Sequence, residues 1–419
     1  MSLSSGLIHE SRRRLSCQLG STNVEYLKCG LQRQMGYCVR SMFRLAVPSI
    51  KKRSYHSEPV SIYKFRDWVE SGETRSEYQG TRSKFKVSTY NILNQHYVWP
   101  SVYKYVPEEY KDWNYRLKLL DSNFAELDAD IMCFQEMEND VYESHWKKSP
   151  VFEGYDSVFM IKDPPKYWDK APELMDGVGL FVRRSKFKII NTVSFKYADF
   201  ALQHPELYHH TDSFTERLIP RNTVGIVATL EHVETKETVF VATTHLYWSP
   251  KFLDINLYHS LILTNVIKQE IKRAHKLNDS QLDNLLQKRM VPIVISGDFN
   301  SKNDSITHQF YSDGHIDLAK IDSFPEVDYG FEKKIIRSNL LPLTSAYRKL
   351  YEQGLFPTST YTDKKVQIID YIWYNSHRMN LVRNLGQIRA EYIASHTPMP
   401  NKDFPSDHIP LISEFELIV

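Results

Sequence analysis

Short apolar runs alternate with polar turns from residue 84 to the end of the chain. Apolar runs of about four to eight residues between turn signals are typical of buried β-strands. The pattern predicts strands at residues 85–93, 130–135, 177–181, 224–230, 239–244, 291–296, 368–374 and 410–415. The runs at 224–230 and 239–244 flank a short polar segment, which predicts a hairpin-like pair.

Two longer segments have helical periodicity. Within residues 113–127, leucine and phenylalanine recur at spacings of three and four, and residues 253–276 predict a long helix. The polar segment 278–289 either extends that helix or forms a loop. Strands alternating with helices predict an α/β protein.

Composition limits the class of protein. The chain has 419 residues, of which 42% are hydrophobic and 25% charged, with 15 Gly and 19 Pro. These values are typical of a globular protein and exclude disordered and collagen-like chains. The sequence contains no internal repeat and no apolar run of 18 residues, so we expect neither a solenoid nor a transmembrane segment. The length allows one large domain or two small ones.

The charge is unevenly distributed. Residues 1–57 hold ten Lys and Arg against two acids, whereas residues 58–419 hold 43 basic and 49 acidic residues and a net charge of −6. A basic, serine-rich, acid-poor N-terminal segment is typical of a mitochondrial targeting peptide. We therefore expect mitochondrial localisation, with 1–57 as a disordered or cleaved targeting segment, 58–83 as a linker and 84–419 as a single catalytic domain. The alternative is a disordered basic extension that does not direct the protein to any compartment.

Cysteine is scarce outside the N-terminal segment. Cys133 is the single cysteine after residue 57. This chain segment therefore has neither an intrachain disulfide nor the cysteine spacing of a thiolate metal site. A reducing compartment is the environment in which such a chain is expected.

Polar residues gather where the predicted strands end. Each one alone has an ordinary explanation, because Asn and Asp make turns and caps wherever strands stop. Together, from six separate strand ends, they supply metal ligands and acid–base groups. The candidates are Asn91, Glu136, His245, Asp298, Asn300, Asp370, Asp407 and His408.

The oxygen-bearing candidates predict a magnesium site. Glu136, with the amide oxygen of Asn91 and the carboxylate of Asp407, offers hard oxygen ligands. Such ligands favour Mg²⁺ over zinc, with Mn²⁺ as a substitute. Mg²⁺ binds through few carboxylates and keeps several waters, which suits a site that also holds a phosphate.

The remaining candidates suit hydrolysis of a phosphate ester. His408 paired with Asp370 is the arrangement that orients an imidazole and stabilises its protonated form. His245 can donate to a phosphoryl oxygen. Asp298 and Asn300 are two residues apart, so we expect both on one side of an extended strand end, where Asp298 orients the attacking water and Asn300 donates an amide hydrogen bond.

The ordered motifs resemble the endonuclease/exonuclease/phosphatase superfamily. Within it they are similar to the carbon catabolite repressor four type, which includes nocturnin, the Angel proteins and mitochondrial 2′-phosphodiesterase. The motifs are TYNIL at Asn91, FQE at Glu136, DGVGLF at Asp176 and HLYWSP from His245, in which H-x-x-W-x-P is the most selective. The resemblance covers about residues 84–419.

The resemblance implies a four-layer αββα sandwich with its site between two sheets. It also implies roles for the candidates. Glu136 would be the principal metal ligand, His408 the base or phosphate stabiliser and Asp370 its orienting partner. Asp298 and Asn300 would handle the water, and the implied substrate contacts are Asn91, Trp248 and Asp176.

One position departs from the resemblance. Deadenylases of this type stack an adenine on an aromatic residue shortly before the IDYI strand, and the nearest position here is Val366. We therefore expect a weak preference for poly(A), unless Tyr361, Trp248 or Trp373 stacks the base instead of packing in the core. The leucine-rich-repeat docking domain of the founding deadenylases is not expected.

The leading functional hypothesis is a monomeric, Mg²⁺-dependent 3′-exoribonuclease that acts on single-stranded RNA in mitochondria. The alternative is a nocturnin-like phosphatase that removes a 2′- or 3′-phosphate from a small nucleotide. A non-catalytic RNA-binding module is disfavoured because the catalytic set is complete. Repair of abasic DNA is disfavoured by the HLYWSP and DGVGLF motifs.

Overall fold

The computed structural model describes residues 61–72, 82–322, 324–330, 334–375 and 377–418, and Glu58–Val419 form one compact unit. The predicted targeting segment 1–57 lies outside the described residues. Within the described part of the chain, no helix combines the length and the apolar character needed to cross a membrane.

A seven-stranded sheet forms one half of the fold. Its order is β1-β16-β17-β2-β3-β5-β4, and all neighbours are antiparallel except the parallel pair β2 and β3. The strands are β1 (Arg66–Glu70), β2 (Arg82–Asn91), β3 (Ile131–Glu138), β4 (Tyr155–Ile161), β5 (Asp176–Arg183), β16 (Met379–Ile388) and β17 (Leu411–Ile418).

A six-stranded sheet forms the other half, in the order β12-β15-β9-β8-β7-β6. Its one parallel pair is β8 and β9. The strands are β6 (Phe187–Lys196), β7 (Val224–His232), β8 (Thr238–His245), β9 (Ile293–Asp298), β12 (Thr344–Ser345) and β15 (Asp370–Asn375). Two small antiparallel pairs join β10 (His315–Asp317) to β11 (Ile335–Arg337) and β13 (Thr360–Tyr361) to β14 (Val366–Gln367).

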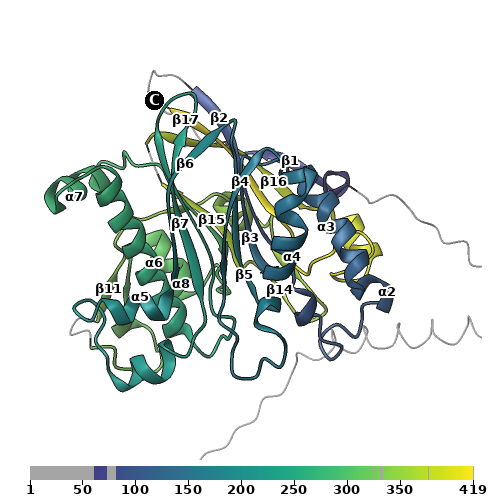
Figure 1. Ribbon diagram of the computed structural model, residues 1–419, viewed down its shortest axis with the longest axis horizontal. Helices are drawn as coiled ribbons and strands as arrows, with labels where there is room; N and C mark the ends of the chain where they lie inside the picture. Colours follow the sequence, from purple (N-terminus) through teal and green to yellow (C-terminus); the bar gives the residue numbers. More distant parts are fainter. Residues whose placement is uncertain (1–60, 73–81, 323, 331–333, 376, 419) are drawn as a thin grey trace, which may run out of the picture. The chain divides into compact units, whose positions relative to one another are not determined.

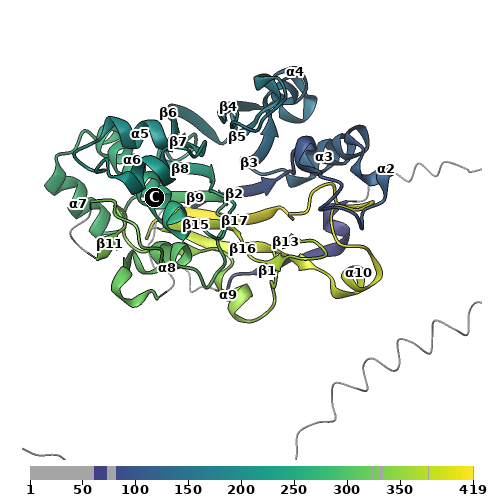
Figure 2. The same ribbon diagram turned by 90° about the horizontal axis from the view of Figure 1, so that it is seen from below.

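Helices cover the outer faces of both sheets (Figures 1 and 2). On the seven-stranded side lie α3 (Trp113–Leu127) and α4 (Asn139–Ser144). On the six-stranded side lie α5 (Tyr197–Gln203), α6 (Leu253–Ala274), α7 (Asp279–Gln287) and α8 (Ile306–Asp313). The short helices α2 (Glu108–Lys111), α9 (Arg348–Glu352) and α10 (Ala390–Ser395) are the remaining α-helices of the described residues. The result is the four-layer αββα sandwich that the resemblance implied.

Strand β3 shows why both faces of the sheet are apolar. Ile131 and Cys133 pack into the core between the sheets, whereas Met132 and Phe134 pack with Phe124 of α3 on the helix side. Successive side chains of a strand point to opposite faces, so a strand covered on both sides has a continuous apolar run. This is the run that predicted the strand.

Each sheet contains one parallel pair whose strands are joined by helix. Chain leaving β2 passes through α3 to reach β3, and chain leaving β8 passes through α6 and α7 to reach β9. Parallel strands end at the same edge of a sheet, and ligands of such sheets bind beyond the carboxyl ends. Asn91, which ends β2, lies 3.0 Å from Asp298, which ends β9, so both parallel pairs end at the same end of the sandwich.

Three differences from the sequence prediction concern element limits. Residues 66–70 form β1, which pairs with β16, so the expected linker 58–83 contributes a strand to the sheet. The segment 278–289 forms the separate helix α7. Strands β4, β6 and β16 were missing from the prediction because their side chains are only partly buried and their apolar pattern is weak.

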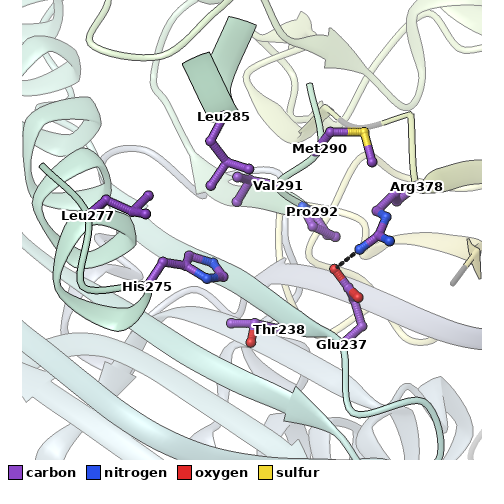
Figure 3. A pocket seen from close by; sticks show the side chains of 9 residues that line it. All are labelled: Glu237, Thr238, His275, Leu277, Leu285, Met290, Val291, Pro292 and Arg378. Carbon is purple, nitrogen blue, oxygen red and sulfur yellow. Dashed lines mark hydrogen bonds and ion pairs between the residues drawn. The ribbon is translucent and has the colours of Figure 1, made fainter. Parts of the chain in front are cut away.

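The cavity in Figure 3 lies where β8 and β9 begin, at the end of these strands opposite to their carboxyl ends. It has a volume of about 380 Å³ and is lined by residues that include Thr238, at the start of β8, and Pro292, just before β9. Glu237 and Arg378 form a 2.7 Å ion pair at its wall. Because His245 and Asp298 stand at the opposite ends of these strands, this cavity is separate from the candidate catalytic residues.

Candidate active site

The strand ends predicted from the sequence meet at one end of the sandwich. Asn91 ends β2 and Glu136 lies near the end of β3, both in the seven-stranded sheet. His245 ends β8 and Asp298 ends β9, both in the six-stranded sheet. Asp370 begins β15 and pairs directly with Asp298 in the antiparallel register, which brings it to the same end.

A β-bulge sets the direction of Glu136. The pairing of β3 with β5 shifts register between Gln135 and Met137, and Glu136 has φ of +59°. A bulge inserts one residue and re-aims its side chain, and a non-glycine residue with positive φ is held by its surroundings. Asn94 supports the new direction because its backbone N–H donates to Glu136 Oε2 over 2.9 Å.

The amide of Asn91 connects the two sheets. Its Nδ2 donates to Glu136 Oε1 and to Asp298 Oδ2, both over 3.0 Å, while its Oδ1 accepts from the backbone N–H of Leu93. Asn91 is a hydrogen-bond donor to the carboxylates in this arrangement, and its expected role as a metal ligand through the amide oxygen stays a prediction. The carboxylates of Glu136 and Asp298 explain this orientation of the amide, because buried or half-buried carboxylates need hydrogen-bond donors.

Asp370 and His408 form a buried pair. Asp370 Oδ2 lies 2.8 Å from His408 Nδ1 and also accepts a 2.6 Å hydrogen bond from the hydroxyl group of Ser359. Ser359 Oγ in turn accepts from the backbone N–H of Asp370 over 3.1 Å. The imidazole is thus fixed in one orientation, with Nε2 directed away from Asp370 and 3.8 Å from Asp298 Oδ2.

Neighbouring charges and burial shift the pKa values of His408 and Asp298. Burial alone would lower the pKa of His408, but the carboxylates of Asp370, Asp407 and Asp298 outweigh it and raise that pKa well above its ordinary value. Burial and the neighbouring Asp370 raise the pKa of Asp298 to about 7, against the opposing effect of His408. The raised pKa favours the protonated form of His408, which suits stabilisation of phosphate. Asp298 is then a better candidate than His408 for accepting a proton.

His245 is held in the opposite state. Burial, then Lys162 and His408, lower its pKa well below the ordinary value, so the ring is neutral. Lys162 Nζ lies 3.3 Å from His245 Nδ1 and 2.6 Å from Asp176 Oδ2. An ammonium group can only donate, so Nδ1 accepts and the ring proton lies on Nε2, where it can be donated to a substrate oxygen.

The turn after Asp298 differs from the expected extended strand end. Asn300 has φ of +47°, its backbone N–H donates to Asp298 Oδ1 over 2.8 Å, and its Nδ2 donates to the carbonyl oxygen of Leu246. This Asx-type turn orients the Asp298 carboxylate. The prediction that Asp298 and Asn300 share one side of an extended strand is therefore wrong. The backbone N–H of Asn300 instead holds the carboxylate of Asp298 in place.

Gly297 allows the two parallel strands to end together. Its φ is +151°, and a Cβ atom placed there would lie 2.0 Å from the carbonyl oxygen of Thr244 in β8. Only glycine fits such a close approach of two backbones. Gly297 thereby holds Asp298 beside His245, whose Nε2 is 3.6 Å from Asp298 Oδ2.

The segment before β17 brings Asp407 to the site. Asp407 Oδ2 accepts a 3.0 Å hydrogen bond from the hydroxyl group of Tyr103. The buried guanidinium of Arg116 fixes the same region, because it donates to Pro405 O over 2.6 Å and to Ile92 O over 2.9 Å. Arg116 therefore joins the loop after β2 to the segment that carries Asp407.

The donor set fits a divalent metal ion. Burial, followed by the carboxylates of Asp176 and Asp407, raises the pKa of Glu136, which indicates excess negative charge that a bound cation would relieve. Within the described chain, Asp298, Asp370 and His408 also place possible ligand atoms within 4.8 Å of one another. Asp370 Oδ1 is buried without a hydrogen-bond partner among the described residues. Oxygen-rich groups of this kind favour hard cations.

The aromatic candidates for base stacking differ in exposure. Trp373 is buried and stacks on Tyr371 and Tyr311, so it belongs to the core and is wrong as a stacking candidate. Trp248 is 63% exposed at the site end of β8. Val366, in β14, is 57% exposed, so the position expected to carry an aromatic residue faces solvent without one.

Several residues at the site escaped sequence reasoning. Lys162 directly follows β4 and so also stands at a strand end, which is the one signal that could have identified it. Tyr103 and Ser359 lie in loops and had no such signal. Arg116 was hidden on a helix, where an arginine is ordinarily exposed.

Comparison with known proteins gives matches over most of the chain. A model of the Endonuclease/Exonuclease/phosphatase family matches residues 88–408. The RNA exonuclease NGL1 of Saccharomyces cerevisiae is 31% identical over 372 residues, which cover 82% of this chain and 95% of that protein. The CCR4-Not complex 3′-5′-exoribonuclease subunit Ccr4 of Kluyveromyces lactis is 30% identical over 367 residues, which cover 84% of this chain.

The chain spans only 45% of the Kluyveromyces subunit, and so less than half of that relative. Among solved structures, ANGEL2, described as a 2′,3′-cyclic phosphatase, superposes with a TM-score of 0.65 at 21% identity. The superposition covers 84% of this chain and 98% of that one. At this identity the likeness supports the fold, the four-layer arrangement described above.

Proposed function

Since the chain belongs to the endonuclease/exonuclease/phosphatase family, we propose that it is a 3′-exoribonuclease that hydrolyses single-stranded RNA with Mg²⁺ as its metal ion. The observation that carries the proposal is the meeting of Glu136, Asp298 and the Asp370–His408 pair at one end of the sandwich. The yeast RNA exonuclease, matched over nearly its whole length, supports RNA as the substrate.

The protein's own groups have separable tasks in this reaction. His408 Nε2 carries a proton and is turned away from Asp370, so it donates to a phosphoryl oxygen. His245 Nε2 donates to a second phosphoryl oxygen because Lys162 occupies Nδ1. Asp298, oriented by Asn300 and Asn91, accepts the proton of the attacking water.

Glu136, with Asp407 nearby, would hold the metal ion. Bound Mg²⁺ neutralises charge on the phosphoryl and leaving oxygens. Mg²⁺ suits this position because the surrounding groups are oxygen donors and because it tolerates a site with few protein ligands.

The decisive experiment uses a 5′-labelled 20-nucleotide RNA and the purified protein with Mg²⁺. We expect a ladder of products that shorten one nucleotide at a time from the 3′ end, with release of nucleoside 5′-monophosphates. An RNA blocked by a 3′-phosphate distinguishes polarity. Internal cleavage as the first event, or intact RNA after full conversion of a small phosphate ester, would refute the proposal.

A small-nucleotide 2′- or 3′-phosphatase is the second candidate. The observation that favours it is the net charge of −6 on residues 58–419, since long polyanions normally bind basic grooves. The two functions share the metal ion and the proton donors. Release of inorganic phosphate from 2′- or 3′-phosphorylated nucleotides, without shortening of RNA, would identify the phosphatase.

Mitochondrial localisation is a further part of the proposal and rests on the basic, acid-poor composition of residues 1–57. A fluorescent protein fused to residues 1–57 should enter mitochondria. The matched control replaces Arg12, Arg13 and Arg14 with glutamine. A fusion that remains diffuse in the cytosol would refute the proposal.

A further inference from the structure

Exposed aromatic side chains gather at the site end of the sandwich. Trp99 is 53% exposed, Tyr167 78% and Trp248 63%, and no other Trp, Tyr or Phe of the described residues is exposed to this extent. They lie in three separate loops: the one after β2, the one between β4 and β5, and the one after β8. All three loops leave the sheets at the end where Asn91, Asp176 and His245 stand.

We define the aromatic shelf as four residues in the first two of these loops: Tyr97, Trp99, Tyr167 and Trp168. The ring centre of Tyr97 lies 6.1 Å from that of Trp99 and 6.5 Å from that of Trp168, both edge to face. Tyr167 is the neighbour of Trp168 in the chain. The loop after β2 and the loop between β4 and β5 therefore pack through their aromatic rings.

A chain of short polar contacts ties the shelf to the catalytic groups. The hydroxyl group of Tyr97 donates to the fully buried Asp176 over 2.6 Å. Asp176 pairs with Lys162, which contacts His245. Tyr97 cannot move without breaking a buried charge-assisted hydrogen bond, so this ring of the shelf is fixed relative to Asp176, Lys162 and His245.

Cations accompany the rings. Lys170 Nζ stands 5.9 Å from the centre of the Trp168 ring, and Lys162 is only slightly exposed beside Asp176. A surface that combines open aromatic faces with ammonium groups matches a nucleobase followed by its phosphate. An apolar protein partner would instead favour a continuous patch that includes aliphatic side chains.

We propose that Trp99 and Tyr167 of the aromatic shelf stack a nucleobase of single-stranded RNA next to the scissile phosphate. This inference rests on the proposed function, because the base belongs to the RNA substrate. The shelf lies in the loops beside β2 and β5, whereas Val366 lies in the β13–β14 hairpin, at the position expected for adenine stacking. The shelf therefore supplies a stacking surface for a base, which Val366 in the hairpin cannot supply.

The test measures binding without turnover, by fluorescence anisotropy of labelled six-nucleotide RNAs with the full chain in EDTA. Trp99→Ala and Tyr167→Ala should each raise Kd about 5- to 150-fold, the range expected for loss of one base stack. Trp99→Phe keeps a stacking face and should remain within about threefold of wild type. Ile190→Ala is the matched control, since Ile190 is 50% exposed on the edge strand β6 and should leave Kd unchanged.

An abasic ribose placed at each RNA position in turn identifies the stacked base. Wild type should lose affinity most strongly at one position, and at that position Trp99→Ala should cause no further loss. A Kd equal to wild type in both alanine variants overturns the shelf. So does an equal loss at every abasic position, because that pattern indicates a structural defect. Circular dichroism establishes that each variant is folded.

The two proposals fail in different ways. If wild type binds RNA through Trp99 but leaves RNA intact with Mg²⁺, the proposed nuclease function fails and the shelf stands. If RNA is shortened normally and Kd does not respond to Trp99→Ala or Tyr167→Ala, the shelf fails and the function stands.

Discussion

His408 Nδ1 and Asp370 Oδ2 lie 2.8 Å apart although they come from different halves of the sandwich. Asp370 begins a strand of the six-stranded sheet, and His408 stands just before a strand of the seven-stranded sheet. The hydrogen bond therefore crosses between the sheets. Its geometry depends on how the two sheets pack, as well as on the two side chains.

Replacing either member of this pair should slow hydrolysis while leaving the fold intact. His408→Ala removes the proton donor to the phosphate, and a loss of about 10²- to 10⁴-fold in rate is expected. Asp370→Asn should lose a similar order because the ring is no longer oriented and its positive charge is less stable. Single-turnover cleavage measures both, with Asp313→Asn in α8 as a surface control. Full activity in either variant would remove that residue from the mechanism.

Glu136→Gln should abolish turnover and weaken metal binding. The neutral amide loses the charge that attracts a divalent cation, while the hydrogen bond from Asn94 persists. Isothermal titration with Mg²⁺ or Mn²⁺ and the cleavage rate provide two independent measurements. EDTA should abolish the activity of wild type, and added Mg²⁺ should restore it. Near wild-type activity of Glu136→Gln at millimolar Mg²⁺ would show that the metal ion binds elsewhere.

Val366→Phe should increase preference for adenine. An exposed aromatic ring in the β13–β14 hairpin would add a stacking surface worth roughly 1 to 3 kcal/mol. The ratio of cleavage rates for oligo(A) and oligo(U) should then rise by about 5- to 150-fold. Val366→Leu is the control for added size without a ring. An unchanged ratio would indicate that bases do not reach this hairpin.

Arg116→Met should destabilise the protein strongly. The guanidinium is buried and donates to the carbonyl oxygens of Ile92, Leu93 and Pro405. Methionine has similar volume but leaves these oxygens without donors, at a cost of about 3 to 5 kcal/mol in the free energy of unfolding. Urea denaturation measures the change. Arg348→Met, which breaks an exposed ion pair with Glu352, should cost less than about 1 kcal/mol.

His259 should make stability depend on pH. It is fully buried in α6, its ring nitrogens have no hydrogen-bond partner among the described residues, and burial lowers its pKa to about 3. The unfolded chain takes up a proton on His259 near pH 6.5 and the folded chain does not. The free energy of unfolding therefore decreases as pH falls below 6.5. At pH 5 the loss is about 2 kcal/mol relative to neutral pH.

His259→Leu removes this titration, so its unfolding free energy should fall less than that of wild type between pH 7.5 and pH 5. Urea denaturation at the two pH values gives the comparison. Parallel losses in the two proteins would show that another buried group is responsible.

The apolar pattern predicted the elements whose side chains are buried on a regular period. Helix α3 has the limits expected from its leucine spacing, and β7 with β8 forms the expected hairpin. Edge strands such as β6 were not predicted, because one side of an edge strand faces solvent and its apolar signal is diluted. The short β1 contains mostly polar residues and looks like a linker in the sequence.

Strand ends, turn residues and the ordered motifs named Glu136, Asp298 and His408 as candidates, but the directions of their side chains could not be predicted. The bulge at Glu136 and the left-handed backbone of Asn300 depend on neighbouring strands far away in sequence. Lysine is common at surfaces and β4 was not predicted, so the strand-end position of Lys162 was not recognised until the structure placed it against His245.

The catalytic candidates lie at one end of the sandwich, so the opposite end can be used to attach the protein to a surface. The turn between β7 and β8 lies at the end far from His245, and Lys236 at this turn is exposed with φ of +60°. A dye, a surface linker or a short affinity peptide inserted there would be at the other end of β8 from His245. The molecule could thus be immobilised in a single orientation with every copy presenting its catalytic end to the substrate.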